Sequence, residues 1–477
     1  MLDWLSSDNV ILLFQMLYIV TAFGVIVLII TENRNPVKTL SWVLVLLFFP
    51  LIGLVIYYFF GEDGRKQRII SHRMFRKLNP EVFQQQDTSQ YTLFPQEHEA
   101  LAHLLQNLDN SQVYTDSKVT FYSDGKSKMD ALCEEIEKAT SSIHVQYYVF
   151  MDDETGCRLR DLLVRKCKEG VKVRLLYDDV GSWKAKRSFF KEMADEGIEV
   201  QAFLKVAFRS LTYRVNYRNH RKIVVVDGKV GFVGGMNVAD RYVKGVDFGI
   251  WRDSHIKVEG KAVAGLQTSF IIDWHYARKE MLTDDIYYPE LEKVGDNMIQ
   301  FATSGPIGQY KSIHMGIIHA IYNAKEYVYV QTPYFIPTDN LNTALQSAAK
   351  RGVDVRLMIP RKSDTTFVNV ATRSFLQDML DAGVSIYMFE PGFLHSKMLI
   401  IDNSLTITGS ANMDVRSFEH NFEINAFIYC EDTAHKANSI FEKDLQMSTL
   451  LDAESWVNRS KRDKLKESFV RLFSPLL

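Results

Sequence analysis

Cysteine is scarce in this sequence, and its opposite charges nearly cancel. Only four of the 477 residues are cysteines and none forms a C-x-x-C pair, so neither a zinc ribbon nor a dithiol redox site is indicated. The 56 Lys and Arg face 58 Asp and Glu, which excludes the basic surplus typical of nucleic-acid-binding domains. We expect reduced structural cysteines in a cytosol-facing domain: Cys133, Cys157, Cys167 and Cys430.

Low-complexity segments are also absent. Hydrophobic residues make up 47% of the chain, with 30 Phe and 22 Tyr, which excludes a disordered protein. The length allows two or three domains, each with a sizeable core.

Two long uncharged apolar runs lie near the N-terminus, at residues 10–30 and 39–60. Each is long enough to cross about 30 Å of hydrocarbon as a helix. A cleaved signal peptide is the alternative for the first run, but Asp3 and Asp8 precede it without any basic residue, the wrong charge for such a peptide. Residues 1–64 are therefore predicted to form a hairpin of two transmembrane helices.

Basic residues beside the two runs predict the orientation. Arg34 and Lys38 lie between the runs, whereas a larger basic cluster follows the second run at residues 65–77. The larger cluster should stay cytoplasmic, which places residues 31–38 outside and the rest of the chain inside.

The remaining sequence is polar and then repeats itself. Residues 65–110 form a basic and polar connector, followed by two halves at 111–290 and 291–477. Each half alternates apolar strands with helices, which predicts a duplicated α/β domain of two mainly parallel sheets flanked by helices. Glycines that end the expected helices in a left-handed conformation precede the strands: Gly170, Gly197, Gly352 and Gly383. The expected strands are 143–150, 171–177, 198–203, 327–331, 353–359 and 384–389.

Both halves carry the pattern H-x-K-x4-D-x6-G-[GS]-x-N. The first copy contains His220, Lys222, Asp227, Gly235 and Asn237, and the second contains His395, Lys397, Asp402, Ser410 and Asn412. His and Lys two residues apart on a strand point to one face. Two accidental copies with the same tail are not credible.

The paired motifs predict a cationic pocket for one phosphate. Lys binds phosphate as a point charge, glycine lets the backbone approach an anion closely, and Asn and Ser add neutral donors. We therefore expect Gly235, Asn237, Ser410 and Asn412 to contribute to substrate binding. Two lysines without a converging set of acidic or thiol ligands would repel a divalent cation, so no metal is expected.

This duplicated motif resembles that of the phospholipase D superfamily. The apolar N-terminal runs and several phrases look like the bacterial cardiolipin synthase branch: Tyr57-Tyr58-Phe59-Phe60-Gly61, Asn219-His220-Arg221-Lys222, Trp251-Arg252-Asp253 and Thr332-Pro333-Tyr334-Phe335-Ile336-Pro337. The resemblance covers nearly the whole chain.

The resemblance implies a covalent mechanism without a cofactor. One histidine attacks phosphorus and forms a phosphohistidine, while the other protonates the leaving alkoxide and later deprotonates the incoming alcohol. The order usual in the superfamily makes His220 the nucleophile and His395 the acid and base, although the sequence alone leaves the two roles interchangeable. Lys222 and Lys397 would stabilise the transition state.

Four carboxylates are candidates for supporting roles. Each imidazole needs its second nitrogen held, and Asp253 and Glu423, close after the two motifs, are the candidates. Asp227 and Asp402 follow the buried strands, so we expect them to orient the site more than to transfer protons.

The expected reaction joins two phosphatidylglycerol molecules into cardiolipin and releases glycerol. The expected partners are phosphatidylglycerol and membrane lipid rather than nucleic acid, and the expected location is the bacterial cell membrane, crossed more than once, with a cytoplasmic catalytic domain. A phospholipase D-type hydrolase of membrane phospholipids is the alternative, followed by a phosphodiesterase acting on nucleic acid. The oligomeric state is left open.

Two further stretches could contact lipid. The stretch between Phe203 and Val226, longer than its counterpart in the second half, is basic and aromatic, and could form a rim for anionic headgroups or a solvated loop. Near the C-terminus, Leu465, Phe469, Leu472 and Phe473 form a helical stripe that could dock onto the domain or lie on the bilayer.

Overall fold

The computed structural model describes residues 7–31, 36–49, 52–55, 57, 94–205, 217–306, 308 and 310–476. The chain divides into two compact units. One contains residues 1–67 and 206–216, and the other contains residues 68–205 and 217–477.

The N-terminal unit contains helices α1 (Ser7–Thr31) and α2 (Pro36–Phe48). The two helices touch, because the Tyr18 hydroxyl donates to the Leu46 carbonyl at 2.6 Å. α1 covers the first apolar run and α2 begins the second, of which residues 50–51, 56 and 58–60 lie outside the described residues. In the described part of the chain, no helix combines the length and apolar character needed to span a membrane.

The other unit holds both halves of the repeat. It opens with α6 (Gln96–Asp109). The first half then contains β1 (Val113–Tyr122), α7 (Gly125–Glu137), β2 (Ser142–Tyr147), α8 (Glu154–Lys168), β3 (Lys172–Asp178), α9 (Arg187–Asp195), β4 (Glu199–Phe203), β5 (Arg218–Asn219), β6 (Ile223–Val226), β7 (Val230–Gly234), α10 (Asp240–Lys244), β8 (Ile250–Arg252), β9 (His255–Glu259), α11 (Val263–Arg278) and η4 (Asp285–Tyr287).

The second half contains β10 (Asn297–Ser304), α12 (Ser312–Asn323), β11 (Tyr327–Gln331), β12 (Phe335–Ile336), α13 (Asp339–Lys350), β13 (Asp354–Pro360), α14 (Thr366–Arg373), α15 (Leu376–Ala382), β14 (Ser385–Phe389), β15 (Gly392–Leu394), β16 (Met398–Ile401), β17 (Leu405–Gly409), β18 (Met413–Asp414), α16 (Val415–Glu419), β19 (Asn421–Tyr429), α17 (Glu431–Gln446), β20 (Ser448–Leu450), α18 (Ala453–Val457), α19 (Lys461–Arg471) and η5 (Ser474–Leu476). All six strands expected from the repeat are present, within a few residues at each end.

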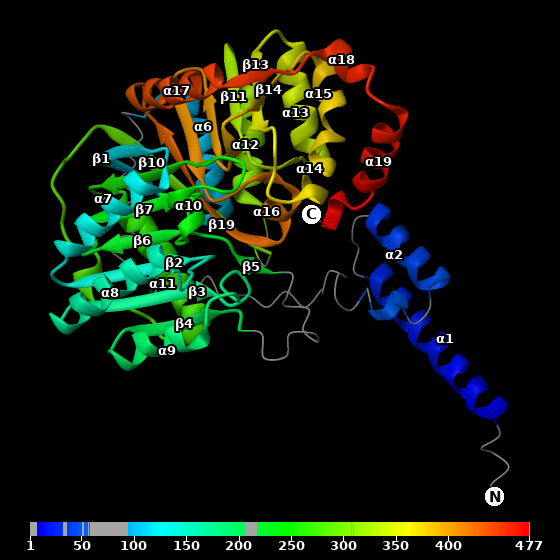
Figure 1. The fold of residues 1–477 in the computed structure, drawn as a ribbon, viewed down its shortest axis with the longest axis horizontal. Helices are drawn as coiled ribbons and strands as arrows, with labels where there is room; N and C mark the ends of the chain where they lie inside the picture. The colour runs from blue at the N-terminus through cyan, green and yellow to red at the C-terminus, as the bar shows by residue number, and fades with distance from the viewer. Residues whose placement is uncertain are drawn as a thin grey trace, which may run out of the picture. The chain divides into compact units, whose positions relative to one another are not determined.

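One large sheet runs through both halves, so the prediction of two sheets was wrong. The order is β20-β14-β13-β11-β16-β17-β19-β10-β1-β9-β7-β6-β2-β3-β4, with β5 pairing to β19. β1 joins the halves, because it pairs with β9 on one side and with β10 on the other. Figure 1 shows this junction between the cyan and green first half and the yellow to red second half.

The prediction of mainly parallel strands was also wrong. Parallel pairing within the large sheet is confined to β2–β3–β4, β11–β13–β14 and β5–β19, among the strands described. The strand after each motif instead turns back on itself through a residue with positive φ, Asp227 at 51° and Asp402 at 50°. Turns this short connect only antiparallel neighbours.

The expected connector ends earlier than residue 110. Its residues 65–93 lie outside the described residues, but residues 96–109 form α6, and Leu101, Ala102 and Leu105 are buried in the core of the second half. The polar composition concealed an amphipathic helix.

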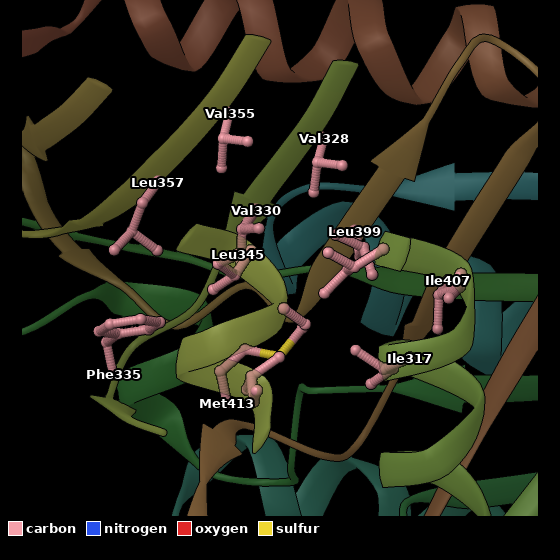
Figure 2. Packing of buried hydrophobic residues seen from close by; sticks show 14 of the residues in the cluster. Ile317, Val328, Val330, Phe335, Leu345, Val355, Leu357, Leu399, Ile407 and Met413 are labelled. Carbon is pink, nitrogen blue, oxygen red and sulfur yellow. The ribbon is translucent and has the colours of Figure 1, made fainter. Parts of the chain in front are cut away.

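The core of the second half lies between the sheet and helices α12 and α13. Figure 2 shows Val328, Val330, Leu357 and Leu399 from the strands facing Ile317 and Leu345 from the helices. This packing fixes the strands whose ends carry the polar site described next.

Candidate active site

Each motif histidine follows a short strand that pairs with the opposite half. β5 runs parallel to β19, and the backbone N–H of His220 donates to the Phe422 carbonyl at 2.9 Å. β15 runs parallel to β8, and the N–H of His395 donates to the Arg252 carbonyl at 2.6 Å. The residue after each acceptor is an acid, so each half brings a carboxylate to the histidine of the other.

The carboxylates contact the rings directly. Nδ1 of His220 lies 2.9 and 3.1 Å from Oε1 and Oε2 of Glu423, and Nδ1 of His395 lies 2.6 Å from Oδ2 of Asp253. A proton shared between Nδ1 and a carboxylate leaves Nε2 of each ring as the reactive nitrogen.

The two histidines line one pocket of about 390 Å³. They lie 203 and 142 residues from the carboxylates they contact, so only the folded chain assembles the site. The pocket is also lined by Tyr148, Val149, Arg218, Asn237, Arg241, Tyr242, Trp251, Tyr334, Ile336, Asp364, Thr365, Val368, Asn412, Asp414, Arg416 and Asn421.

Both motif lysines are buried beneath their histidines. The Lys222 ammonium donates to the carbonyl of His220, and the Lys397 ammonium donates to the carbonyl of His395 at 2.6 Å. Nζ of Lys397 also lies 3.0 Å from Nε2 of His395. The Lys397 ammonium therefore stands beside the reactive nitrogen of His395, and the Lys222 ammonium is held at the backbone of His220. Neither lysine is among the residues that line the pocket, so both would act on an anionic phosphorus centre from behind its wall.

Burial sets the protonation of these groups. It lowers the pKa of Lys222 to about 7 and that of Lys397 to about 8, because a desolvated ammonium is disfavoured. Burial, reinforced by Lys397, lowers the pKa of His395 to about 4, and burial also lowers the pKa of His220. Burial alone would raise the pKa of Glu423 and Asp253, but the neighbouring histidines and lysines hold both pKa values below their usual range.

The structure places Asp227 and Asp402 outside the pocket. Asp227 accepts hydrogen bonds from the backbone N–H groups of Thr140, Ser141 and Ser142 at 2.8 to 2.9 Å. Asp402 holds residues 325–327 in the same way at 2.6 to 2.9 Å. Both aspartates belong to the repeated motif and were expected to orient the site, and each ties its motif turn to the start of β2 or β11.

Gly235 and Ser410 contact the carboxylates and do not line the pocket. A Cβ atom on Gly235 would lie 2.1 Å from Oδ1 of Asp253, so glycine makes room for that side chain. At the matching position, the Ser410 hydroxyl donates to Oε2 of Glu423. The Gly-to-Ser difference between the two motif copies therefore changes the surroundings of Asp253 and Glu423, and it places no hydroxyl in the pocket where a phosphate would bind.

Asn237 and Asn412 do line the pocket. Oδ1 of Asn237 accepts from the N–H of Val149 at 3.0 Å, and its amide donates to the Tyr242 hydroxyl. The Asn412 amide donates to Asp414 at 3.0 Å. Both amides are therefore held in place by neighbours at the wall of the pocket.

Several pocket residues escaped the sequence prediction. The Tyr148 ring lies 4.9 Å from the His220 ring, and Nζ of Lys222 lies 5.4 Å from the Tyr148 ring centroid. Trp251 lies 5.0 Å from the His395 ring and donates to Asp253 at 3.3 Å. Trp251 and Tyr334 lie in the short segments on which the family resemblance was based. That resemblance was the available sequence signal for these pocket-lining aromatic residues.

The basic stretch around the first motif is largely internal where it is described. Arg218 pairs with Asp178 at 3.3 Å, and Arg221 pairs with Asp273 at 2.8 Å, all four side chains being buried. These arginines anchor the loop that carries His220. Residues 206–216 of the expected headgroup rim lie outside the described residues.

No group of three His, Cys, Asp or Glu side chains in the described part of the chain could hold a metal ion. The site is instead a pair of imidazoles, each held by a carboxylate and backed by an ammonium. Such a set can attack a phosphodiester, stabilise the resulting negative charge and move one proton.

Comparison with known proteins agrees with this chemistry. A family model described as "Cardiolipin synthase, PLD-like domain" matches residues 132–268 and 317–445, and one described as "Phospholipase_D-nuclease N-terminal" matches residues 17–62. The chain is 39% identical over 481 residues to a cardiolipin synthase of Oceanobacillus iheyensis, covering 98% of this chain and 99% of the relative. It is also 39% identical over 479 residues to the major cardiolipin synthase ClsA of Bacillus subtilis, with 98% and 99% covered.

A solved structure shares the fold. The phosphatidylserine synthase of Haemophilus influenzae Rd KW20 superimposes with a TM-score of 0.60 at 13% identity, covering 79% of this chain and 100% of that chain. With two family models and near full-length relatives in agreement, the chain belongs to the cardiolipin synthase family of the phospholipase D superfamily.

Proposed function

We propose that this enzyme transfers a phosphatidyl group from one phosphatidylglycerol to a second, giving cardiolipin and glycerol. The observation that carries the proposal is the single pocket lined by His220 and His395, each bound through Nδ1 to a carboxylate of the opposite half. The cardiolipin synthase relatives support phosphatidylglycerol as donor and acceptor.

In the first step, Nε2 of His220 attacks the phosphorus and displaces the glycerol alkoxide. The bond from phosphorus to the leaving oxygen breaks as the bond to nitrogen forms, and His395 supplies a proton to the departing oxygen. Glu423 balances the positive charge that develops on the His220 ring. Lys222 and Lys397 offset the added negative charge around phosphorus.

In the second step, the glycerol hydroxyl of another phosphatidylglycerol replaces the histidine. His395, now neutral, takes the hydroxyl proton as the oxygen attacks phosphorus, and the bond to His220 breaks. His395 must therefore carry a proton when the donor is bound. Burial lowers the pKa of the His395 ring, and the negative charge of a phosphodiester bound beside the ring would favour its protonated form.

We further propose that residues 1–64 insert in the bacterial cell membrane as a hairpin, with the catalytic unit in the cytoplasm. The uncharged runs at 10–30 and 39–60 and the basic cluster at 65–77 support this arrangement. Single cysteines placed at residue 35 and residue 292 of a cysteine-free variant test it. An impermeant thiol reagent added to intact cells should label residue 35 alone, and labelling of residue 292 alone would reverse the topology.

Product analysis tests the reaction. Purified enzyme in phosphatidylglycerol vesicles should produce cardiolipin and glycerol in equal amounts. Phosphatidic acid as the main product would identify a hydrolase with the same site, because water would then be the acceptor. Turnover of a nucleic-acid diester in preference to lipid would contradict the assignment of the substrate class.

A further inference from the structure

Helix α19 leaves its apolar side uncovered. Leu465, Phe469 and Leu472 are 73%, 60% and 74% exposed. Their spacing of four and three residues places them on one side of the helix, whereas the buried Glu467 and Val470 lie on the opposite side. Of the two alternatives that the sequence left open for this stripe, docking onto the domain does not hold for these three residues.

The other side of α19 is firmly held. Glu467 accepts hydrogen bonds from Arg373 at 3.1 Å and from Arg459 at 2.8 Å, and Arg471 donates to Asp378 at 2.8 Å. Figure 1 shows α19, in red, at the outer edge of the second half near α14. The helix is fixed by polar contacts while its apolar stripe faces away from the core.

Basic side chains surround the exposed stripe. Asp463 is the exposed acid of the helix, against four exposed cations: Lys461, Arg462, Lys464 and Lys466. Long cationic side chains beside an apolar stripe suit the headgroup level of an anionic bilayer. If two copies of the protein packed together through this side of α19, their lysine and arginine side chains would face one another. The resulting repulsion disfavours a dimer formed through the apolar stripe.

Aromatic rings connect the stripe to the pocket. The Phe469 ring lies 5.5 Å from the Phe473 ring, which lies 6.1 Å from the ring of Phe367 on α14. Phe367 is 43% exposed, and its neighbours Thr365 and Val368 line the pocket. The exposed apolar surface therefore extends from α19 through Phe473 and Phe367 to residues next to the pocket.

We propose that Leu465, Phe469 and Leu472, with Phe367 and Phe473, form a face that contacts the surface of an anionic bilayer. This bilayer face sets the pocket mouth at the depth of the phospholipid headgroups. The benefit to catalysis rests on the proposed function, whereas contact with the bilayer does not.

The first test compares two forms of substrate in the full-length enzyme. The variant Leu465→Ser, Phe469→Ser, Leu472→Ser should lose at least about tenfold in activity on phosphatidylglycerol vesicles, because a misplaced site meets its substrate poorly. Its activity on dispersed short-chain phosphatidylglycerol should be unchanged. The matched control Val294→Ser, Met315→Ser, Tyr322→Ser replaces exposed apolar residues elsewhere and should keep both activities.

Hydrogen exchange gives a readout that does not depend on catalysis. Amides of residues 461–473 in the parent enzyme should exchange more slowly in phosphatidylglycerol nanodiscs than in phosphatidylcholine nanodiscs. Equal exchange rates in the two kinds of nanodisc would overturn the proposal. So would an equal loss of activity of the triple variant on vesicles and on dispersed short-chain lipid, or a parent dimer that becomes a monomer in the triple variant. A parent enzyme that is protected but forms no cardiolipin would refute the proposed function and leave the bilayer face standing.

Discussion

At the scale of single residues, the site depends on an exchange of carboxylates between the halves. His220 takes its partner Glu423 from the second half, and His395 takes Asp253 from the first. Both acids are fully buried, so each is a fixed negative charge beside its ring. The sequence identified the two acids as candidates, but it gave no means of telling which acid serves which histidine.

Replacing either carboxylate by its amide should impair catalysis. Glu423→Gln and Asp253→Asn keep the shape but remove the charge that stabilises an imidazolium, so kcat should fall by about 10²- to 10⁴-fold, the usual contribution of acid–base catalysis. Steady-state kinetics on phosphatidylglycerol measures this. The exposed Glu292→Gln serves as control, and unchanged kcat in both site variants would refute the role.

The buried ammonium groups predict a distinctive pH dependence. Lys222 and Lys397, with pKa values lowered to about 7 and about 8, lose their protons as the pH rises through those values, and phosphate affinity falls with them. The affinity for a non-reacting phosphodiester should therefore weaken as the pH rises through these values. Because a bound phosphodiester favours the charged ammonium groups, its binding near these pH values should be accompanied by proton uptake.

On the acidic side, His220 must be neutral to attack. Since burial lowers its pKa, kcat/KM should stay high as the pH falls to 6.5 and should decline only below that. The profile of kcat/KM against pH measures this decline, and a phosphodiester affinity that stays constant as the pH rises through the pKa values of Lys222 and Lys397 would contradict the role assigned to the lysines.

At the scale of elements, the strands of each half could be predicted from their apolar runs, but their directions could not. Six expected strands are present, and the glycines before four of them have φ between 90° and 97°. The turns at Asp227 and Asp402 reverse the chain after each motif, and an Asp-Gly pair at 227–228 was the local signal for this reversal. The pairing of β5 with β19 and of β8 with β15 depends on tertiary packing, which two- or three-residue strands do not reveal in sequence.

The close approach of Gly235, just after β7, to Asp253, just after β8, predicts a position that tolerates only glycine. Gly235→Ala places a Cβ atom against the Asp253 carboxylate, which must move away from His395, and a displacement of about 1 Å can cost about 10²-fold in rate. The kcat of the variant should fall by that order while its thermal unfolding midpoint changes little. Gly24→Ala, where the added Cβ atom would meet nothing within 4 Å, is the matched control; if the two variants had equal activity, steric exclusion at Gly235 would be refuted.

A buried ion pair holds β8 beside the second half. Arg252 donates to both carboxylate oxygens of Asp444 at 2.9 and 2.6 Å. Arg252→Met leaves the buried Asp444 carboxylate without its cation, with the Gln331 amide still donating to it at 2.7 Å, so the free energy of unfolding should fall by about 3–5 kcal/mol. Denaturant unfolding of the detergent-solubilised enzyme measures it. The partly exposed Arg356→Met should cost about 1 kcal/mol or less, and equal losses would contradict this account.

At the scale of the whole molecule, the two halves form one continuous sheet and one pocket. The duplicated motif predicted the shared pocket, since neither copy alone supplies both an attacking and a proton-transferring histidine. The junction through β1 could not be predicted, because β1 lies before the first repeated strand and pairs with strands far along the chain. Likewise, α6 was hidden by its polar composition.

Trapping the covalent intermediate tests most directly whether both histidines act on one phosphorus atom. His395→Ala removes the acid and base but leaves Nε2 of His220 free to attack, so enzyme mixed with phosphatidylglycerol, quenched at alkaline pH because the phosphorus–nitrogen bond is acid-labile, and analysed by mass spectrometry should carry a phosphatidyl group on His220. His220→Ala should carry none. An adduct on residue 395 in the His220→Ala variant would reverse the roles, and turnover without any adduct in either variant would contradict the shared mechanism.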